Sequence, residues 1–429
     1  MEQQTRQSRA AARKKRRMLQ RQQMCRLMGY LLIAGILVTS VLNLFTRDKD
    51  FSASENRMLA GRPELSVAAI VDGSYMSGLE DYQADQFFGR DGWISLKLKI
   101  DRFFGKKEAS GVYLADDNYL MEIPVEPNYE SVQRNLSAIT DFAARYPELN
   151  IKMMVVPNAV SVMAGYLPKN APVRDQMADL QMIKDGLPAN VGFIDVTQTL
   201  MDHVDEGMFY RTDHHWTSRG AYYAFLDASD DLGITQLKEY NRYAVTTQFE
   251  GTLGSKSGCH AVRDTIEVYE PLNPGSSFYV TYDETQEKSC SLFRSACLED
   301  KDQYTVFFGG NYPRITIRTT NNNDRCLLIF KDSYANCFIQ FLTPYYEEIV
   351  LVDPRYYYDD AGALISTEKV TDVLFLYNLS TYMGDTSLAD TLEAAQKPEM
   401  ATAAPADGET ADGETADGET TEEETTQEA

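Results

Sequence analysis

Apolar residues form one long uninterrupted run near the N-terminus. From Leu27 to Phe45 the chain carries no charged side chain, and nine arginines and lysines precede this run between residues 6 and 26. A helix of about 19 residues rises roughly 28 Å, which matches the hydrocarbon core of a bilayer. The pattern predicts a transmembrane helix over 27–45 behind a basic cytoplasmic head at 1–26, since positive charge stays on the cytoplasmic side.

A cleaved signal peptide is the alternative interpretation of this run. The apolar core of a signal peptide is usually shorter, and the sequence Asn43-Leu44-Phe45-Thr46 offers no small-residue cleavage site. We therefore expect a retained single-pass anchor in the cell membrane, with the lipid bilayer as a partner and the main domain extracytoplasmic. Beside a membrane span, the basic head is expected to set topology and contact anionic lipid, and not nucleic acid.

Beyond the anchor, short apolar runs alternate with amphipathic segments. A helix is predicted over 129–144, because apolar residues recur there on one helical face. Buried strands are predicted at 151–156, 194–196, 327–330, 349–352 and 373–377. Helical patterns lie between several of these strands, at 218–232, 334–342 and 362–371. The alternation predicts a layered α/β domain with a mainly parallel sheet.

The other segments complete the expected domain plan. Residues 46–110 are expected to form a membrane-proximal linker and helical region, and 111–385 the main domain, which starts with a hairpin at 111–121. The polar stretch 241–323 fits the alternation less well and is expected to be an insertion with antiparallel strands. Residues 386–429, with three Ala-Asp-Gly-Glu-Thr repeats, are predicted to be a disordered acidic tail, because they have little apolar surface to offset the ordering entropy.

Charge and cysteine content add little to this picture. The tail supplies about half of the formal net charge of −23, so the acidity does not identify partners of the folded domain. Cys25 lies at the membrane boundary, and the five cysteines beyond it are too irregular for a disulfide framework. Cys326 and Cys337 are expected in the core, and pairing of Cys290 with Cys297 stays open.

The segment Asp213-His214-His215-Trp216 holds two of the four histidines and one of the two tryptophans in the chain. Three interpretations compete. A metal site is disfavoured because neighbouring side chains of an extended segment point to opposite faces, and no metal is expected. A structural motif would pack the tryptophan beside a helix capped by Thr217. A catalytic motif would pair Asp213 with His215 on one face, with His214 pointing away.

A second segment favours the catalytic interpretation. The apolar run 327–330 leads through Lys331 and Asp332 to Ser333 and a predicted helix. A serine at such a strand-to-helix junction is exposed at the carboxyl edge of the sheet, where helix amides can face an oxyanion. The alternative is that Asp332 or Ser333 only caps the helix. Because a hydroxyl needs a base, His215 oriented by Asp213 would complete a catalytic triad.

With these motifs the sequence resembles a known family. The Asp-His-His-Trp segment, the stretch Glu55-Asn56-Arg57, the motif at 85–90 and the block at 331–335 are similar to those of the bacterial DHHW proteins. These proteins are similar to the alginate O-acetylation proteins of the SGNH-hydrolase superfamily, and the resemblance covers about 51–383. It implies a circularly permuted motif order, with Ser333 as nucleophile, His215 as general base and Asp213 as its orienter.

The resemblance also suggests supporting residues. The Ser333 amide and Asn378, at the end of a later strand, would donate to the oxyanion, and Arg355 would bind substrate. Independently of the resemblance, Tyr334 is expected to bind substrate because an aromatic ring can stack on a sugar. Lys331 departs from the family pattern, which has glycine at the start of the serine block, where the backbone makes a close approach.

Together these observations predict a membrane-anchored extracytoplasmic SGNH-like acyltransferase or esterase. Its partner would be a cell-envelope polysaccharide carrying O-acetyl groups, with a membrane protein as acyl donor, and no cofactor is expected. The alternative is a non-catalytic SGNH-like module that binds glycan or an envelope protein, because a fold does not by itself determine activity. A catalytic site requires Ser333 and His215 within hydrogen-bond reach, whereas a binding module does not.

Overall fold

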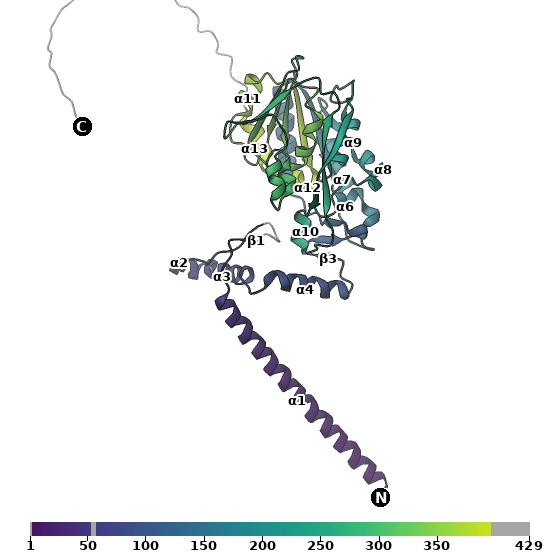
Figure 1. Ribbon diagram of the computed structural model, residues 1–429, viewed down its shortest axis with the longest axis vertical. Coiled ribbons are helices and arrows are strands. Elements are labelled where there is room, and N and C mark those ends of the chain that lie inside the picture. Colours follow the sequence, from purple (N-terminus) through teal and green to yellow (C-terminus); the bar gives the residue numbers. More distant parts are fainter. Residues whose placement is uncertain (1, 53–56, 396–429) are drawn as a thin grey trace, which may run out of the picture.

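The computed structural model describes residues 2–52 and 57–395 and has three parts (Figure 1). The long helix α1 (Glu2–Phe45) leads to a layer of three helices, α2 (Val67–Val71), α3 (Ser74–Asp85) and α4 (Arg90–Phe103), which lies across its end. The main domain lies on the other side of this layer. Over Lys14–Phe45, α1 is long and apolar enough to cross a membrane, with a mean hydropathy of 2.0 in its most apolar window, none of which is buried.

The main domain is built on an eight-stranded sheet with strand order β11-β10-β12-β14-β13-β15-β6-β7. Five strands are parallel: β6 (Asn150–Val156), β7 (Val191–Ile194), β13 (Cys326–Lys331), β14 (Glu348–Val352) and β15 (Asp372–Asn378). Three antiparallel strands extend one edge: β10 (Phe278–Tyr282), β11 (Glu287–Ser289) and β12 (Arg314–Thr319). Every residue of the central strands β13 and β15 is buried, as their continuous apolar sequence predicts.

Helices cover both faces of the sheet. Alternate residues of β13 supply two separate cores, with Leu327 and Ile329 in one and Leu328 and Phe330 in the other. The first core packs against α6 (Ala159–Val162), α8 (Thr197–Asp202) and α9 (Ser218–Ala228). The second packs against α5 (Tyr129–Arg145), α7 (Gln176–Gly186), α11 (Ala361–Thr367) and α12 (Leu379–Gly384). The prediction of a layered α/β domain with a mainly parallel sheet is confirmed.

The polar stretch 241–323 contains antiparallel strands, as expected, but it is not a separate insertion. Strands β8 (Tyr240–Phe249) and β9 (Asp264–Pro271) form their own hairpin around the short helix α10 (Thr252–Ser257). Strands β10, β11 and β12 join the central sheet itself. The hairpin expected at 111–121 is also present, as β4 (Val112–Leu114) and β5 (Leu120–Glu122), and β3 (Glu108–Ala109) adds a third short strand.

One boundary and one element type differ from the sequence predictions. The folded domain continues into the predicted tail, because α13 (Ser387–Ala394) packs on α5, with Asn135 Oδ1 accepting from the Ala389 amide at 3.0 Å. The repeat region lies outside the described residues. The helix predicted at 334–342 consists of two short 3₁₀ turns, η6 (Ser333–Cys337) and η7 (Ile339–Phe341).

The cysteines that the structure describes are all free, including Cys290 and Cys297, and Cys326 and Cys337 are buried as expected.

Candidate active site

Ser333 lies at the end of β13, where the chain turns from the sheet into η6. Asp332 fixes this turn, since its Oδ1 accepts from the Tyr334 amide at 2.9 Å and its Oδ2 accepts from the Asn378 amide at 2.9 Å. Asp332 and Tyr334 are buried, whereas Ser333 is partly exposed. The turn therefore presents the serine hydroxyl at the carboxyl edge of the parallel sheet.

His215 lies between Ser333 and Asp213, although 118 residues separate it from the serine. Its Nε2 is 2.8 Å from Ser333 Oγ, and its Nδ1 is 2.5 Å from Asp213 Oδ1. The tautomer that satisfies both contacts carries its proton on Nδ1, so that Nε2 accepts from the serine hydroxyl. The structure thus brings the three residues together in the order that the sequence predicted.

Asp213 is buried, and both of its carboxylate oxygens accept hydrogen bonds. Oδ1 accepts from the backbone amide of His215 at 3.0 Å, and Oδ2 accepts from the amide and the hydroxyl of Thr252 at 2.8 and 3.0 Å. Burial opposes ionisation most strongly, but the charges of His214 and His215, the hydrogen bond from His215 and the Thr252 amide together lower the pKa of Asp213. The carboxylate is therefore ionised and fixed in position.

The imidazole of His215 is nearly inaccessible to solvent. Burial and the nearby charge of His214 lower the pKa of His215 to about 4, and Asp213 opposes this shift only in part. A neutral imidazole at neutral pH can accept a proton. The phenol ring of Tyr304, in η5 (Gln303–Val306), stacks on it with 3.9 Å between ring centroids.

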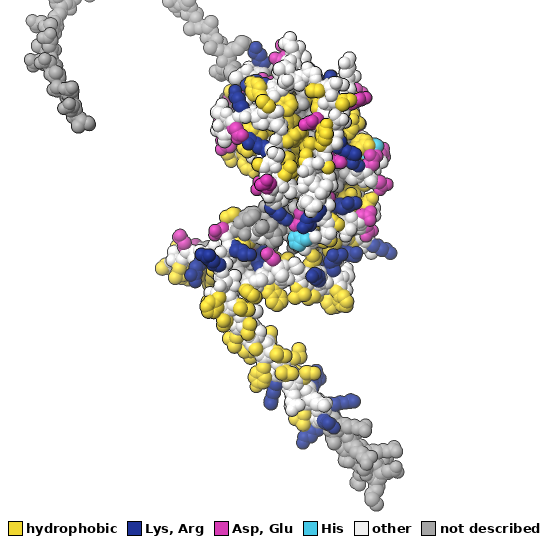
Figure 2. Space-filling view, viewed as in Figure 1, with side chains coloured by type: hydrophobic (Ala, Val, Ile, Leu, Met, Phe, Trp, Pro, Cys, Tyr) yellow, Lys and Arg dark blue, Asp and Glu magenta, His cyan; other side chains and the backbone are white. Residues whose placement is uncertain are grey.

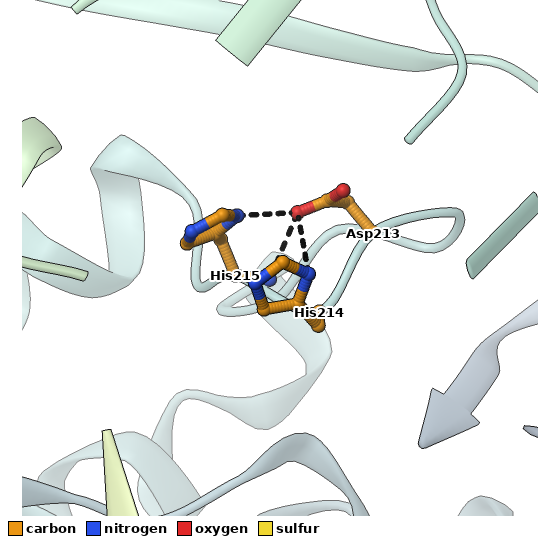
Figure 3. Close-up of side chains that lie close together, drawn as sticks. All are labelled: Asp213, His214 and His215. Atoms are coloured by element: carbon orange, nitrogen blue, oxygen red, sulfur yellow. Dashed lines mark hydrogen bonds and ion pairs between the residues drawn. The ribbon is translucent and has the colours of Figure 1, made fainter. Parts of the chain in front are cut away.

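His214 does not point away, contrary to the sequence prediction. Figure 3 shows both imidazoles directed toward Asp213, and His214 Nδ1 lies 3.7 Å from Asp213 Oδ1 and 2.8 Å from Thr252 Oγ1. The prediction assumed an extended segment with alternating faces. The chain instead bends through 211–215, where Asp213 Oδ1 accepts from the amide two residues further on.

Asp213, His214 and His215 each bring one potential metal ligand within 4.8 Å of the others. A tetrahedral metal with bonds of about 2.0–2.1 Å would hold a nitrogen and an oxygen ligand roughly 3.3 Å apart. The observed 2.5 Å between His215 Nδ1 and Asp213 Oδ1 is a hydrogen-bond distance, and the other ring nitrogen faces Ser333. The group has the geometry of a hydrogen-bonded chain and does not fit a metal centre.

The structure places Asn378, which the sequence suggests as an oxyanion donor, at the end of β15 and the start of α12. Its side-chain oxygen caps α12 by accepting from the amides of Ser380 and Thr381, and it also accepts from Asn158 Nδ2 at 3.1 Å. Its Nδ2 faces the Val156 carbonyl at 3.4 Å. Its backbone amide donates to Asp332, the residue before Ser333, so Asn378 stays a proposed second oxyanion donor.

Tyr334 is placed differently from the expectation. Its side chain is buried, its hydroxyl donates to the His214 carbonyl, and its ring stacks on Trp216. The Trp216 indole donates in turn to the Tyr334 carbonyl at 2.8 Å. Tyr334 cannot stack on a substrate, because this packing already holds the Asp-His-His-Trp segment against η6.

Arg355 lies beside the site and pairs with Asp353, through Nε to Oδ1 at 2.8 Å and Nη2 to Oδ2 at 2.6 Å. Its charge contributes to the low pKa of His215, and its side chain is partly exposed. Lys331 extends toward the same carboxylate, with Nζ 3.7 Å from Asp353 Oδ2 and 3.2 Å from Asn311 Oδ1. The lysine at the start of the serine block is therefore accommodated among polar partners, and Ser333 still reaches His215.

Several residues of the site were not found from the sequence, and all come from the polar stretch 241–323. Thr252 contacts Asp213 directly, and Tyr304 contacts His215 directly. Asp264 shapes the bend before Asp213 by accepting from the amides of Arg211 and Thr212. Gly251 leaves room for the acid, because a Cβ there would lie 2.2 Å from Asp213 Cβ.

A pocket of ≈ 420 Å³ opens beside His214. Thr252, Leu253 and Lys256 of α10 line one side, and Ser380 and Thr381 of α12 line another. The lining mixes hydroxyl, amide, charged and apolar groups, which suits a polar ligand.

A mainly parallel sheet with Ser-His-Asp at its carboxyl edge defines an SGNH-like α/β protein. More narrowly, the chain belongs to the DHHW protein family, whose model matches residues 114–352.

Several solved structures are similar to this chain. A DHHW family protein from Eubacterium siraeum is 26% identical, with 68% of this chain and 98% of that chain covered and a TM-score of 0.57. PatB1 from Bacillus cereus, solved with a sulfonyl adduct, is 21% identical, with 64% and 97% covered and a TM-score of 0.55. The O-acetyltransferase domain of AlgJ from Pseudomonas putida is 15% identical, with 66% and 99% covered and a TM-score of 0.41. No curated protein matches the sequence.

Proposed function

We propose that this protein is a membrane-anchored extracytoplasmic serine enzyme. It transfers or removes acyl groups, principally acetyl groups, on a cell-envelope polysaccharide. The observation that carries the proposal is the unbroken chain from Ser333 Oγ through His215 to Asp213, with gaps of 2.8 and 2.5 Å. A non-catalytic binding module would not need this contact. Burial keeps His215 neutral at neutral pH, so its Nε2 is available to accept the serine proton.

The first half-reaction forms an acyl-serine. Ser333 Oγ attacks the carbonyl carbon of an acyl ester while His215 Nε2 takes the hydroxyl proton, and Asp213 stabilises the imidazolium. The tetrahedral intermediate collapses with cleavage of the ester C–O bond, and the leaving alcohol receives the proton from His215. The acyl group then remains as an ester on Ser333.

The second half-reaction releases the acyl group. His215 takes a proton from the acceptor hydroxyl, whose oxygen attacks the acyl-serine carbon, and the proton returns to Ser333 Oγ as that bond breaks. A sugar hydroxyl as acceptor gives transfer, and water gives hydrolysis. A membrane protein would be the acyl donor in the first half-reaction, and the polysaccharide would be the acyl acceptor in the second.

The oxyanion of both intermediates would be stabilised by the Ser333 amide. Ser333 is the first residue of η6, and the first amides of a helical turn have no partner within it. Arg355 is the cationic group proposed for substrate contact, since it is partly exposed and its charge already acts on His215. The pocket beside His214 is proposed for the polyhydroxylated acceptor.

Acetyl-ester turnover tests the proposal. Ser333→Ala and His215→Ala should each lower turnover by about 10³-fold or more, and the double variant should lose little further, because the groups act as one unit. His203→Ala is the matched control, since His203 lies on the surface beside Glu206. Additive losses, or full activity of Ser333→Ala, would reject the catalytic role. Adding an acetyl-accepting oligosaccharide then separates transfer from hydrolysis.

A further inference from the structure

Helix α4 has two apolar faces, and only one of them packs against the main domain. Leu98 is buried in a small core with Val112, Leu120 and Leu253, the last of which belongs to α10. Ile94 reaches the same region, because a Cβ on Gly258 would lie 3.1 Å from its Cγ2. This inner face connects α4 to the helix whose first residue, Thr252, holds the Asp213 carboxylate.

The second face of α4 is exposed and apolar. The exposed fractions are 51% for Trp93, 45% for Leu96, 46% for Ile100 and 85% for Phe103. At about 100° of rotation per residue these four side chains fall within an arc of roughly 80°, on the side of the helix away from Ile94 and Leu98. Four large apolar side chains in one stripe are more than a surface helix of a soluble domain needs to expose.

The exposed stripe lies at the end of α1. The turn between α3 and α4 is tied to that helix, since the Phe88 amide donates to Asn43 Oδ1 at 2.9 Å. Figure 1 shows α4 extending sideways from the end of α1, and Figure 2 shows hydrophobic side chains along the side of α4 from which α1 extends. The apolar surface of α1 and the stripe of α4 therefore face one common region.

Basic residues accompany the stripe. Between Arg90 and Lys107 the chain has six arginines and lysines against two aspartates, whereas the whole chain has a formal net charge of −23. Lys97 and Lys99 follow the stripe on either side of its arc, where long side chains can reach lipid headgroups. An aromatic and aliphatic stripe flanked by lysines is typical of helices that lie in the membrane interface.

We propose that α4 lies flat in the headgroup region of the same bilayer that α1 spans, with Trp93, Leu96, Ile100 and Phe103 at the acyl boundary and its basic residues on anionic phospholipid. The inference rests on the proposed membrane anchor. A single helix would leave the domain free to rotate about its linker. The contact of α4 with the bilayer is a second point of attachment. Because Leu98 of α4 packs against α10, this attachment holds the Ser333 site in one orientation close to the membrane surface.

Tryptophan fluorescence tests this placement in the full chain, reconstituted into vesicles of phosphatidylcholine and phosphatidylglycerol. The chain has two tryptophans, and Trp216 is fully buried, so a lipid-dependent signal must come from Trp93. Phosphatidylcholine brominated near the headgroup should quench Trp93 emission, and aqueous iodide should not. Trp93→Phe should abolish the quenching by lipid.

Two further variants provide controls. In the Trp93→Phe background, Tyr358→Trp places a reporter at a main-domain position that is 89% exposed, and it should respond to iodide and not to brominated lipid. Leu96→Glu with Ile100→Glu alters exposed side chains only, so the domain should still fold and turn over a soluble ester while the lipid quenching of Trp93 falls several-fold.

The outcomes separate this inference from the anchor. If the full chain does not float with vesicles, the anchor fails. If it floats and Trp93 is quenched by iodide but not by lipid, the anchor stands and the inference is overturned. Protection of Trp93 from both quenchers would mean that protein, such as a second copy of the chain, covers the stripe, and this also overturns the inference.

Discussion

Tyr304 contacts His215 and the backbone of Ser333 at the same time. Its ring lies parallel to the His215 imidazole, with 3.9 Å between centroids and 12° between the planes, and its hydroxyl donates to the Ser333 carbonyl at 3.1 Å. Stacking restricts the tilt of the imidazole, and the hydrogen bond fixes η6 relative to it. Tyr304 therefore holds both partners of the 2.8 Å contact between His215 Nε2 and Ser333 Oγ in position.

The two contacts of Tyr304 can be separated by substitution. Tyr304→Phe keeps the stacking and loses one hydrogen bond, so kcat/KM for an acetyl ester should fall less than about tenfold and stability by about 1 kcal/mol. Tyr304→Ala also opens a cavity in the core, and should cost about 3–5 kcal/mol and at least roughly 100-fold in kcat/KM. Denaturant unfolding and steady-state kinetics measure both effects, and equal losses in the two variants would contradict the positioning role.

A methyl group at Gly251 should displace the catalytic acid. The backbone of Gly251 is ordinary, with φ of −80°, but a Cβ there would lie 2.2 Å from Asp213 Cβ and 2.4 Å from its Oδ2. Gly251→Ala should therefore lower kcat/KM by about 10²-fold or more, because small displacements of a triad are costly. Gly165→Ala is the matched control, since its Cβ would meet nothing within 4 Å. Equal activity of the two variants would show that Asp213 is not held as described.

The hydroxyl of Thr252 should matter separately from its amide. Thr252→Val keeps the backbone donor to Asp213 Oδ2 and removes the hydroxyl that also faces His214 Nδ1. We expect kcat/KM to fall roughly tenfold, in line with the loss of one hydrogen bond to a charged group. Thr252→Ser should restore it. A serine variant as impaired as the valine variant would point to packing of the methyl group instead.

The pH dependence should reflect the buried imidazole. Because the pKa of His215 is lowered to about 4, the neutral base is present above that value, and kcat/KM should rise through pH 4 and then stay level toward neutrality. Folding stability should change in the matching direction. The pKa of His215 is about 4 in the folded protein and near 6.5 in the unfolded chain. The free energy of unfolding should therefore be highest above pH 6.5 and should decrease as the pH falls toward 4. An acidic limb of kcat/KM at pH 6.5 would contradict the desolvation of His215.

The sheet and the position of Ser333 at its carboxyl edge could be predicted because their signals are local in the sequence. Continuous apolar runs mark β13, β14 and β15, and the polar turn after β13 marks Ser333. Asp213 and His215 pair as predicted, but across a bend and not on one face of an extended segment. The tail boundary was misplaced because the acidic repeats dominate the composition of the C-terminal region, although Leu388 and Leu392 have helical spacing and are buried.

The surroundings of the triad carry no such local signal. Thr252 lies 39 residues from Asp213, and Tyr304 lies in a polar stretch without periodicity, so only the tertiary fold brings them to the site. The orientation of His214 depends on a bend stabilised by Asp213 itself, and alternation along an extended strand does not describe a bend. Asn378 has the residue type of an oxyanion donor, and its side-chain oxygen also caps α12, which the sequence did not indicate.

Covalent trapping with a sulfonyl fluoride tests the central claim most directly. Intact-mass and peptide analysis should show one sulfonyl group per chain, on Ser333, because His215 makes this hydroxyl far more nucleophilic than other serines. His215→Ala should remain unlabelled over the same time, whereas His203→Ala should label like the unchanged chain. No label on Ser333 of the folded protein, or labelling of His215→Ala at the unchanged rate, would contradict the account.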